Sequence, residues 1–371
     1  MKSILFTQTD NVELMVVGGN PLGGAVVETF VWMKALHELG YSVIQSRNLG
    51  DERALKPGFD WITFQPSYDP NKGIKWLRWV SYRFPRYFQH LKNANPDFVY
   101  ESIPTWSSFF TAIMCKMLGV KLILRIANDN MLDKRILITH TPGRRFLIYR
   151  AFGLAEFIFP QNKYQFSRLT EMFPGKRIHL LYNPFVIDAQ YLVPKKAMNG
   201  YVAWVANFRF QKNLKLLHEL AEEFKEYRFK IAGAPLLPLD DETSTYLNKL
   251  REMENVEFVG TIGRESILDF FSKSIFLLNT SRYEGFSNTF LEAMATGTPI
   301  LTSNSVNPDG IIDTYELGLV YSTAEDLRKQ IKSVDENVYG RMSNNCCEYI
   351  NMHHGHIQIG KDFISILENN N

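Results

Sequence analysis

The sequence predicts an α/β protein built from two parallel sheets, each covered by helices. The first observation is that short apolar runs alternate with longer amphipathic segments in both halves of the 371-residue chain. The second is length, because a chain of this size outgrows a single hydrophobic core. The third is a segment rich in turn residues, 194–200, which interrupts the alternation before a new strand. We therefore expect two domains with a linker near residue 195.

In the first half, short apolar runs bounded by turn residues predict strands, and longer runs with helical periodicity predict helices. The predicted helices at 26–39 and 107–118 are followed by Gly40 and Gly119, and glycine readily adopts the left-handed conformation that closes a helix. The predicted strands are residues 3–6, 42–45, 97–100, 122–126, 157–160 and 179–181.

The second half repeats this alternation. Its predicted strands are residues 201–205, 229–232, 256–259, 274–278 and 300–302, and its predicted helices are 214–226, 244–253, 266–272 and one that begins at 324. The expected domains are residues 1–195 and 196–350, both Rossmann-like. Residues 351–371 are expected to form a C-terminal helix that can cross back to the first domain.

Composition favours a cytoplasmic enzyme. No apolar run approaches the roughly 20 residues that span a bilayer, and the apolar segment at the N-terminus is too short for a signal peptide. Charge is uneven: residues 1–195 carry a net charge of +9 and residues 196–371 a net charge of −7. Such asymmetry is compatible with an anionic membrane surface as partner, or with two domains that attract each other. No recognisable nucleic-acid module accompanies it, so no nucleic acid is expected.

Residues 283–299, YEGFSNTFLEAMATGTP, follow a predicted strand and open a predicted helix. Gly285 breaks the chain, and either Ser287 or Asn288 can act as N-cap. The first-turn amides of such a helix lie at the positive end of its dipole, which suits an anion such as a diphosphate. Glu284 and Glu292 lie eight positions apart on either side of the turn, so they would bracket a ligand. Two ordinary surface acids are the alternative.

This run resembles the E-x7-E signature of retaining glycosyltransferases with the GT-B fold, family four, also called glycosyl transferases group 1. The resemblance implies two Rossmann-like domains whose sheets face each other across a cleft, with the acceptor on the N-terminal side and the donor on the C-terminal side. It places the donor sugar at Glu284 and the ribose at Glu292. It places the diphosphate at the turn formed by Gly285, Phe286, Ser287, Asn288 and Thr289, where Ser287 replaces the usual glycine of the family.

Other segments resemble parts of the same family pattern. A glycine-rich loop at 18–24 precedes the first helix, and its Gly23 and Gly24 would let the backbone approach a phosphate or sugar; a flexible turn is the alternative. The element at 201–213 resembles the segment that neutralises the donor diphosphate, a role that falls here on Arg209 and Lys212. The loops at 230–235 and 259–262, with Gly233 and Thr261, resemble those near the nucleobase.

The chain departs from the family at Ala127, where many members carry a histidine that contacts the donor sugar. Asn128 or Asp129 could supply a substitute hydrogen bond, and Asp129 is also a candidate base for the acceptor; a simple turn is the alternative. No D-x-D motif lies in a suitable loop, and the histidines at 353, 354 and 356 lack a spacing typical of metal ligands. We therefore expect neither a metal nor a cofactor.

The resemblance implies a metal-independent retaining hexosyltransferase-type enzyme. Its donor would be a nucleotide-diphosphate sugar, with a UDP-sugar favoured slightly over a GDP-sugar, and its acceptor a lipid-linked or cell-surface glycan precursor. The alternatives are a sugar-nucleotide epimerase or a phosphorylase on the same scaffold, and a degenerate binding subunit. Cations and aromatic residues interleave from 72 to 92, which is typical of contact with the inner face of a membrane, although core packing explains the aromatic residues equally well. The cations proposed for this contact are Lys72, Lys75, Arg78, Arg83 and Arg86.

Overall fold

The computed structural model of the chain describes residues 1–21 and 23–369. It divides into two compact units. Unit 1 comprises Met1–Pro184 together with His356–Asn371, and unit 2 comprises Phe185–Gly355. The boundaries predicted from the sequence lie near 195 and 350. In the structure, the segment from 185 to 195 packs with unit 2, although it precedes the first strand of that unit.

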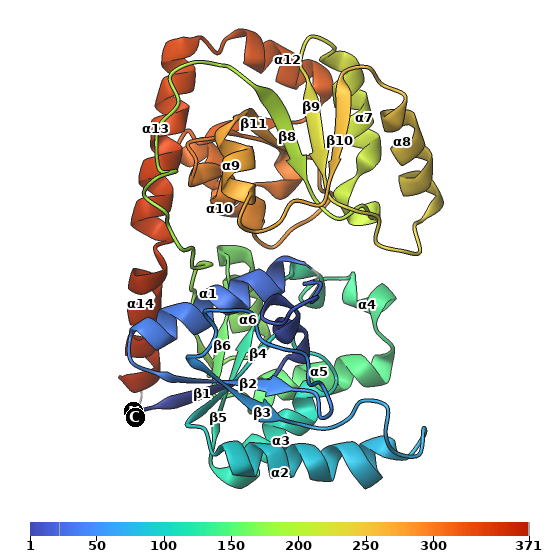
Figure 1. Ribbon diagram of the computed structural model, residues 1–371, viewed down its shortest axis with the longest axis vertical. Helices are drawn as coiled ribbons and strands as arrows, with labels where there is room; N and C mark the ends of the chain where they lie inside the picture. Colours follow the sequence, from blue (N-terminus) through green and yellow to red (C-terminus); the bar gives the residue numbers. More distant parts are fainter. Residues whose placement is uncertain (22, 370–371) are drawn as a thin grey trace. The chain divides into compact units, whose positions relative to one another are not determined.

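Unit 1 contains a seven-stranded parallel sheet in the order β3-β2-β1-β4-β5-β6-β7 (Figure 1). The strands are β1 Ser3–Phe6, β2 Ser42–Arg47, β3 Ile62–Pro66, β4 Phe98–Ser102, β5 Lys121–Arg125, β6 Phe157–Phe159 and β7 Arg177–Ile178. The helices are α1 Gly24–Glu38, α2 Phe84–Ala94, α3 Ser108–Leu118, α4 Ile136–Thr139, α5 Pro142–Leu154, α6 Lys163–Met172 and α14 His356–Glu368.

The core of unit 1 lies on both faces of its sheet. Successive side chains of a strand point to opposite faces, so Ile4 and Phe6 join one apolar cluster and Leu5 joins the other. Helices α1 and α14 cover the first face, where the rings of Trp32 and Phe363 lie 5.0 Å apart. This contact explains why the C-terminal helix belongs to unit 1 although unit 2 precedes it in the chain.

Unit 2 contains a six-stranded parallel sheet in the order β10-β9-β8-β11-β12-β13. The strands are β8 Tyr201–Val205, β9 Phe229–Ala232, β10 Val256–Gly260, β11 Ser274–Asn279, β12 Ile300–Ser303 and β13 Gly318–Tyr321. The helices are α7 Leu214–Glu223, α8 Asp241–Arg251, α9 Ile267–Ser272, α10 Asn288–Met294, α11 Ile311–Thr314, α12 Ala324–Lys332 and α13 Glu336–His353.

The predicted α/β class with two parallel sheets is confirmed. Strands β1, β8 and β9 have the predicted bounds. The strand predicted at 179–181 is wrong, because these residues form no strand and β7 lies just before them, at 177–178. The sequence analysis missed β3 and β13, which are edge strands with partly exposed side chains, so neither shows the unbroken apolar run of a buried parallel strand. Within residues 1–21 and 23–369, no helix has the length and apolar character needed to cross a bilayer.

Candidate active site

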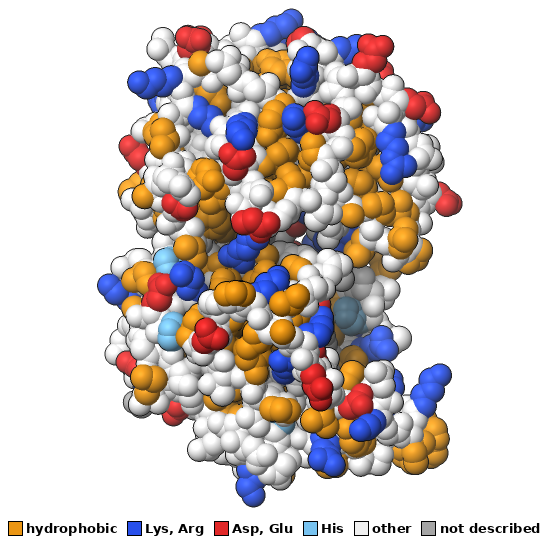
Figure 2. Space-filling model, in the orientation of Figure 1, with side chains coloured by type: hydrophobic (Ala, Val, Ile, Leu, Met, Phe, Trp, Pro, Cys, Tyr) orange, Lys and Arg blue, Asp and Glu red, His pale blue; other side chains and the backbone are white. Residues whose placement is uncertain are grey.

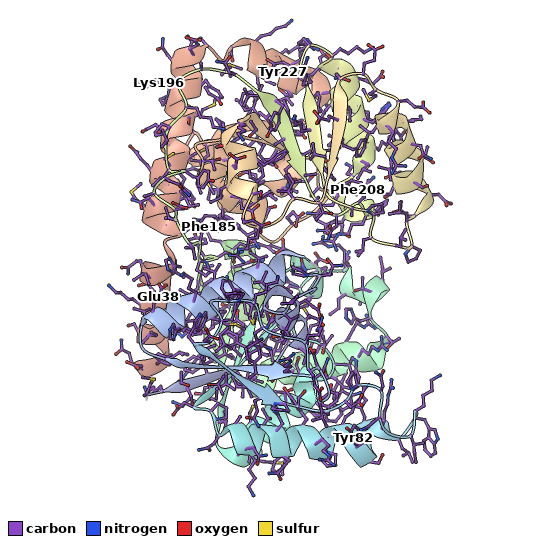
Figure 3. The ribbon with its side chains drawn as sticks, viewed as in Figure 1. Glu38, Tyr82, Phe185, Lys196, Phe208 and Tyr227 are labelled. Atoms are coloured by element: carbon purple, nitrogen blue, oxygen red, sulfur yellow. The ribbon has the colours of Figure 1, made fainter. Side chains whose placement is uncertain are left out.

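The order of the strands in each sheet creates a switch point. Counted by their own strands, the sheet of unit 2 runs 3-2-1-4-5-6 and that of unit 1 runs 3-2-1-4-5-6-7. The connections therefore diverge between β1 and β4 in unit 1 and between β8 and β11 in unit 2. Ligands of doubly wound α/β proteins bind at the carboxyl end of such a point. In Figure 3, Phe208 marks the carboxyl end of the sheet of unit 2, and Tyr227 marks the opposite end. Lys212 follows β8 and Glu284 follows β11, so both belong to this point.

Lys212 and Glu284 form an ion pair at the switch point of unit 2, with the Nζ of Lys212 donating to Oε1 of Glu284. The two side chains are only 14% and 10% exposed. The hydroxyl of Ser281 donates a second hydrogen bond, of 2.9 Å, to the same carboxylate oxygen. The structure therefore joins the two residues that the sequence analysis assigned to the diphosphate and to the donor sugar.

Buried hydrogen bonds explain how two loops so far apart in the sequence meet. The indole nitrogen of Trp204 on β8 donates to Oγ1 of Thr280, at 2.9 Å. The hydroxyl of Thr280 in turn donates to the carbonyl of Lys212, at 2.8 Å. A side chain of β8 and the end of β11 thus fix the backbone of the residue that carries the cation.

The turn after Glu284 is held by its own side chains. Phe286 is buried and packs against the rings of Phe290 and His354. Ser287 has the extended backbone of an N-cap, and its hydroxyl lies 2.8 Å from that of Thr289. Helix α10 begins at Asn288, so Ser287 is the one of the two predicted N-cap candidates that takes this position. These contacts fix the turn that was assigned to a diphosphate.

Glu292 lies in α10 and is partly buried. Burial raises the pKa of its carboxyl to about 7, and the charge of Arg264 opposes this shift. A carboxyl group whose pKa is raised to about 7 by burial is typical of a functional site. The sequence analysis did not single out Arg264, which belongs to the segment after β10.

The remaining donor-side residues differ in their surroundings. Arg209 is exposed beside Lys212 and is therefore accessible to a ligand. Thr261 is exposed directly after β10. Gly233 has φ +135°, and a Cβ there would lie 1.9 Å from the carbonyl oxygen of Ala206. Glycine is thus required for the packing of two loop backbones, a structural reason that is sufficient without a ligand.

In unit 1, the glycine-rich loop leads into α1. Gly23 adopts φ +87° as N-cap, and Gly24 is the first helical residue. Leu22, in the same loop, lies outside the described residues. Because a positive φ strongly favours glycine, this conformation alone accounts for Gly23.

Asn128 and Asp129 follow β5 and Ala127. Oδ1 of Asp129 accepts hydrogen bonds from Asn162, at 3.2 Å, and from Gln165, at 2.8 Å. Burial raises the pKa of the Asp129 carboxyl, while these two amide donors lower it. One oxygen of this carboxylate is therefore engaged in fixing the loop to α6.

A buried ion pair fixes the start of this same region. Arg125, the last residue of β5, is fully buried and its Nε donates to Glu28 of α1. The guanidinium also donates to the carbonyl of Leu181, at 3.0 Å, and to the side chain of Asn183. Glu28 lies in α1, the helix that follows the glycine-rich loop, and the ion pair gives it a structural role.

The structure places the predicted residues in both units. Gly23, Gly24, Asn128 and Asp129 belong to unit 1, and Arg209, Lys212, Gly233, Thr261, Glu284 to Thr289 and Glu292 belong to unit 2. Sequence reasoning missed Ser281 and Arg282, although both are polar residues directly after a buried strand, and such residues lie at the binding edge of a parallel sheet.

Solved structures of the same fold extend over the whole chain. Sucrose-phosphate synthase from Thermosynechococcus elongatus is 14% identical, with a TM-score of 0.77 over 100% of this chain and 99% of that chain. HepE from Anabaena, in complex with UDP and glucose, is 15% identical, with a TM-score of 0.73 over 100% of both chains. At these identities the likeness shows the fold alone, which is the GT-B fold.

Residues 193–350 match the profile of the glycosyl transferases group 1 family. A curated relative, glycosyltransferase 1 domain-containing protein 1 of Xenopus tropicalis, is 27% identical over 155 residues, which are 40% of this chain and 45% of that protein. The match to glycosyl transferases group 1 thus covers the segment that carries the E-x7-E motif, and it is the family that this motif resembles.

Proposed function

We propose that the chain transfers a hexose-type glycosyl group from a nucleotide-diphosphate sugar to an acceptor, with retention of the anomeric configuration. The observation that carries this proposal is the Lys212–Glu284 pair, which lies at the switch point of unit 2 and begins the E-x7-E motif. A UDP-sugar is the favoured donor, because HepE, which has the same fold, was solved with UDP and glucose.

The residues of unit 2 fit the charges that develop in such a transfer. The bond between the anomeric carbon and the diphosphate breaks, and Arg209, Lys212 and the first turn of α10 neutralise the departing diphosphate. Glu284 orients the sugar and supports the positive charge that develops on it. The acceptor oxygen bonds to the anomeric carbon on the same face, and its proton passes to the departing phosphate. This scheme needs neither a metal nor an enzymatic nucleophile.

Two residues of unit 1 are proposed to complete the donor-sugar contacts. Asn128 and Asp129 follow Ala127, so their polar groups lie in the loop from which the family histidine is missing. Asn128 is the stronger candidate for a hydrogen bond to the sugar, because Oδ1 of Asp129 already accepts two hydrogen bonds. The raised pKa of Asp129 suits the alternative role of accepting a proton from the acceptor.

The test is to incubate the purified chain with UDP-, GDP- and ADP-sugars and to measure released nucleotide together with the sugar products. Slow release of nucleoside diphosphate from one donor, with a retained anomeric configuration, is the expected result. Formation of an epimer favours a sugar-nucleotide epimerase, and transfer to or from free phosphate favours a phosphorylase. Donor binding in a thermal-shift assay without any turnover identifies a degenerate binding subunit.

The pKa of Glu292 predicts how donor binding depends on pH. The carboxylate form is needed to accept the ribose hydroxyls, and because the pKa is raised to about 7, that form is lost as the pH falls through 7. KM for the donor should therefore rise up to about tenfold from pH 8 to pH 6, since a nucleotide sugar does not itself titrate in this range. Glu292→Gln should raise KM at pH 8 and remove its pH dependence. An equal wild-type KM at both pH values would contradict the assignment.

We propose that the acceptor is carried at the inner face of a membrane, and that unit 1 contacts this surface. Ile74, Trp76 and Val80 are exposed, Trp76 by 81%, in a segment that also carries exposed Lys72 and Lys75. In Figure 2, hydrophobic and cationic side chains lie together at the lower right, where the chain leads into α2 in Figure 1. Apolar side chains that insert among headgroups and cations that meet lipid phosphates are typical of interfacial binding.

Not every residue of this segment is available for such contact. Arg83 donates to the carbonyl of Pro70, at 2.6 Å, and lies over the rings of Tyr68 and Trp79. Trp79 itself packs against Trp106 and Phe110. Arg83 and Trp79 therefore have structural roles, whereas Arg78 is partly exposed and Arg86 is exposed.

A second stretch of unit 1, around α4 and α5, also exposes apolar side chains together with cationic ones. Leu137, Ile138 and Phe146 are exposed, Ile138 by 89%, and Lys134 and Arg144 are exposed near them in the sequence. The sequence analysis missed this stretch, because Leu137 and Ile138 look like core residues of a short helix when burial is unknown.

Trp76→Glu should reduce binding to anionic vesicles at least severalfold, because a charge replaces the side chain that inserts among the headgroups. Co-sedimentation with vesicles of phosphatidylglycerol and phosphatidylcholine at low salt measures this effect. Met352→Glu is the matched control, because Met352 is an exposed apolar residue of unit 2, 64% accessible, and should bind like wild type. Wild-type chain that stays in the supernatant would remove the proposed membrane contact.

A further inference from the structure

The side chain of Arg282 makes several contacts next to the Lys212–Glu284 pair. Its Nε donates to the carbonyl of Phe210, at 3.1 Å, and its Nη2 donates to Oδ1 of Asn213, at 3.1 Å. The guanidinium lies 4.1 Å from the centre of the Phe210 ring and forms an ion pair with Glu242 of α8. Phe210 and Asn213 lie on either side of Lys212 in the sequence.

The backbone of Arg282 contributes as well. Its N–H donates to the carbonyl of Gln211, at 2.8 Å, and the side chain of Gln211 donates back to the carbonyl of Tyr283, at 2.8 Å. The segment before Glu284 and the turn that carries Lys212 are thus joined by side-chain and main-chain hydrogen bonds. The turn itself is tight, because Asn213 has φ +54° and caps α7.

We propose that Arg282 is a positioning residue that holds the turn 209–213 so that Lys212 is directed at Glu284. The proposal rests on the proposed function for its kinetic consequence, but its structural part stands independently. Arg282 donates hydrogen bonds to Phe210 and to Asn213, which lie before and after Lys212. The turn therefore cannot rotate while both hydrogen bonds are present. Contact of Arg282 with the donor itself is not needed.

Arginine is required here for its shape rather than for its charge. A guanidinium is planar and rigid, so it can donate to Phe210 and Asn213, pair with Glu242 and lie over the Phe210 ring at once. A lysine at this position would keep the positive charge near the site but would supply one point of attachment. Arg282→Lys therefore separates positioning from simple electrostatics.

The chain offers a matched control in Arg328 of α12. Arg328 also uses a forked guanidinium, pairing with Glu223 and Glu226, and lies 4.7 Å from the centre of the Phe224 ring. It belongs to the same unit but joins α12 to the end of α7, away from the Lys212 turn. Arg328→Lys thus causes a comparable loss of contacts without disturbing this turn.

The experiment measures donor turnover and hydrogen exchange in parallel. Arg282→Lys should lower kcat/KM for the donor about 100-fold, the scale expected for a misplaced catalytic group, whereas Arg328→Lys should leave it within a factor of two. In the Lys212→Met background the same change should cost no further activity, because Arg282 acts through Lys212. Peptides covering residues 206–213 should exchange faster in Arg282→Lys than in Arg328→Lys.

Equal losses of activity in the wild-type and Lys212→Met backgrounds would overturn the proposal, because Arg282 would then act on the donor directly. Unchanged exchange of residues 206–213 would overturn it too. If the wild-type chain turns over no donor, the proposed function fails. The exchange measurement still decides whether Arg282 holds the turn, since it needs no activity.

Discussion

Lys212→Met should reduce donor turnover about 100- to 1000-fold, the range expected when one charged group that stabilises a transition state is removed. The reason is the position of the ammonium group, which lies against Glu284 at the carboxyl end of β8 and β11. Glu284→Gln should cause a loss of similar size, because the amide keeps the shape of the side chain but not its charge. Steady-state kinetics with the donor found in the nucleotide-sugar panel measure both effects.

A double variant separates catalysis from structural stability. Each single change leaves one largely buried charge without its partner, which costs stability, whereas Lys212→Met with Glu284→Gln removes both charges together. The double variant should therefore melt closer to wild type than either single variant and yet remain inactive. Lys329→Met is a control for removing a lysine, because Lys329 forms an exposed pair with Glu325. Activity that recovered together with stability would show that the pair serves only the fold.

The local features of the fold were predictable from the sequence. Buried parallel strands appear as continuous apolar runs, so β8 and β9 were located with their correct bounds, and helix α10 was placed from its cap residues. The motif around Glu284 then indicated the family, and the profile match over residues 193–350 bears this out. Lys212 and Glu284 were predicted separately, each from its own loop.

Contacts between distant residues were not predictable. Nothing in the sequence indicates that Arg125 pairs with Glu28, or that Arg282 reaches Phe210 and Asn213, since both depend on the way strands are ordered in a sheet. The burial of individual side chains was not predictable either. Trp76 and Trp79 lie three residues apart in one basic segment, and only the structure shows that Trp76 is exposed and that Trp79 packs against Trp106. A pattern of residue types defines which elements form, but not which side chains meet.

The Glu28–Arg125 pair should prove the most costly single interaction to break. Arg125→Met should lower the free energy of unfolding of unit 1 by about 3 to 5 kcal/mol, because it leaves the buried carboxylate of Glu28 without its cationic partner and with only the indole N–H of Trp32 as donor. The carbonyl of Leu181 also loses its donor. Urea unfolding followed by tryptophan fluorescence is suitable, since five of the six tryptophans belong to unit 1.

Adding Glu28→Met to Arg125→Met tests whether the loss of stability arises from the uncompensated charge of Glu28. The double variant Glu28→Met with Arg125→Met should recover part of the loss, because a buried ion pair replaced by apolar side chains of similar volume is often neutral. Recovery should stay incomplete, since the carbonyl of Leu181 and the side chain of Asn183 still lack the donor that Arg125 supplied. Because Arg125 ends the strand that leads to Ala127, Asn128 and Asp129, any shift that remains should appear in this loop. A double variant no more stable than Arg125→Met would mean that the cost comes from the lost hydrogen bonds to Leu181 and Asn183 rather than from the uncompensated charge of Glu28.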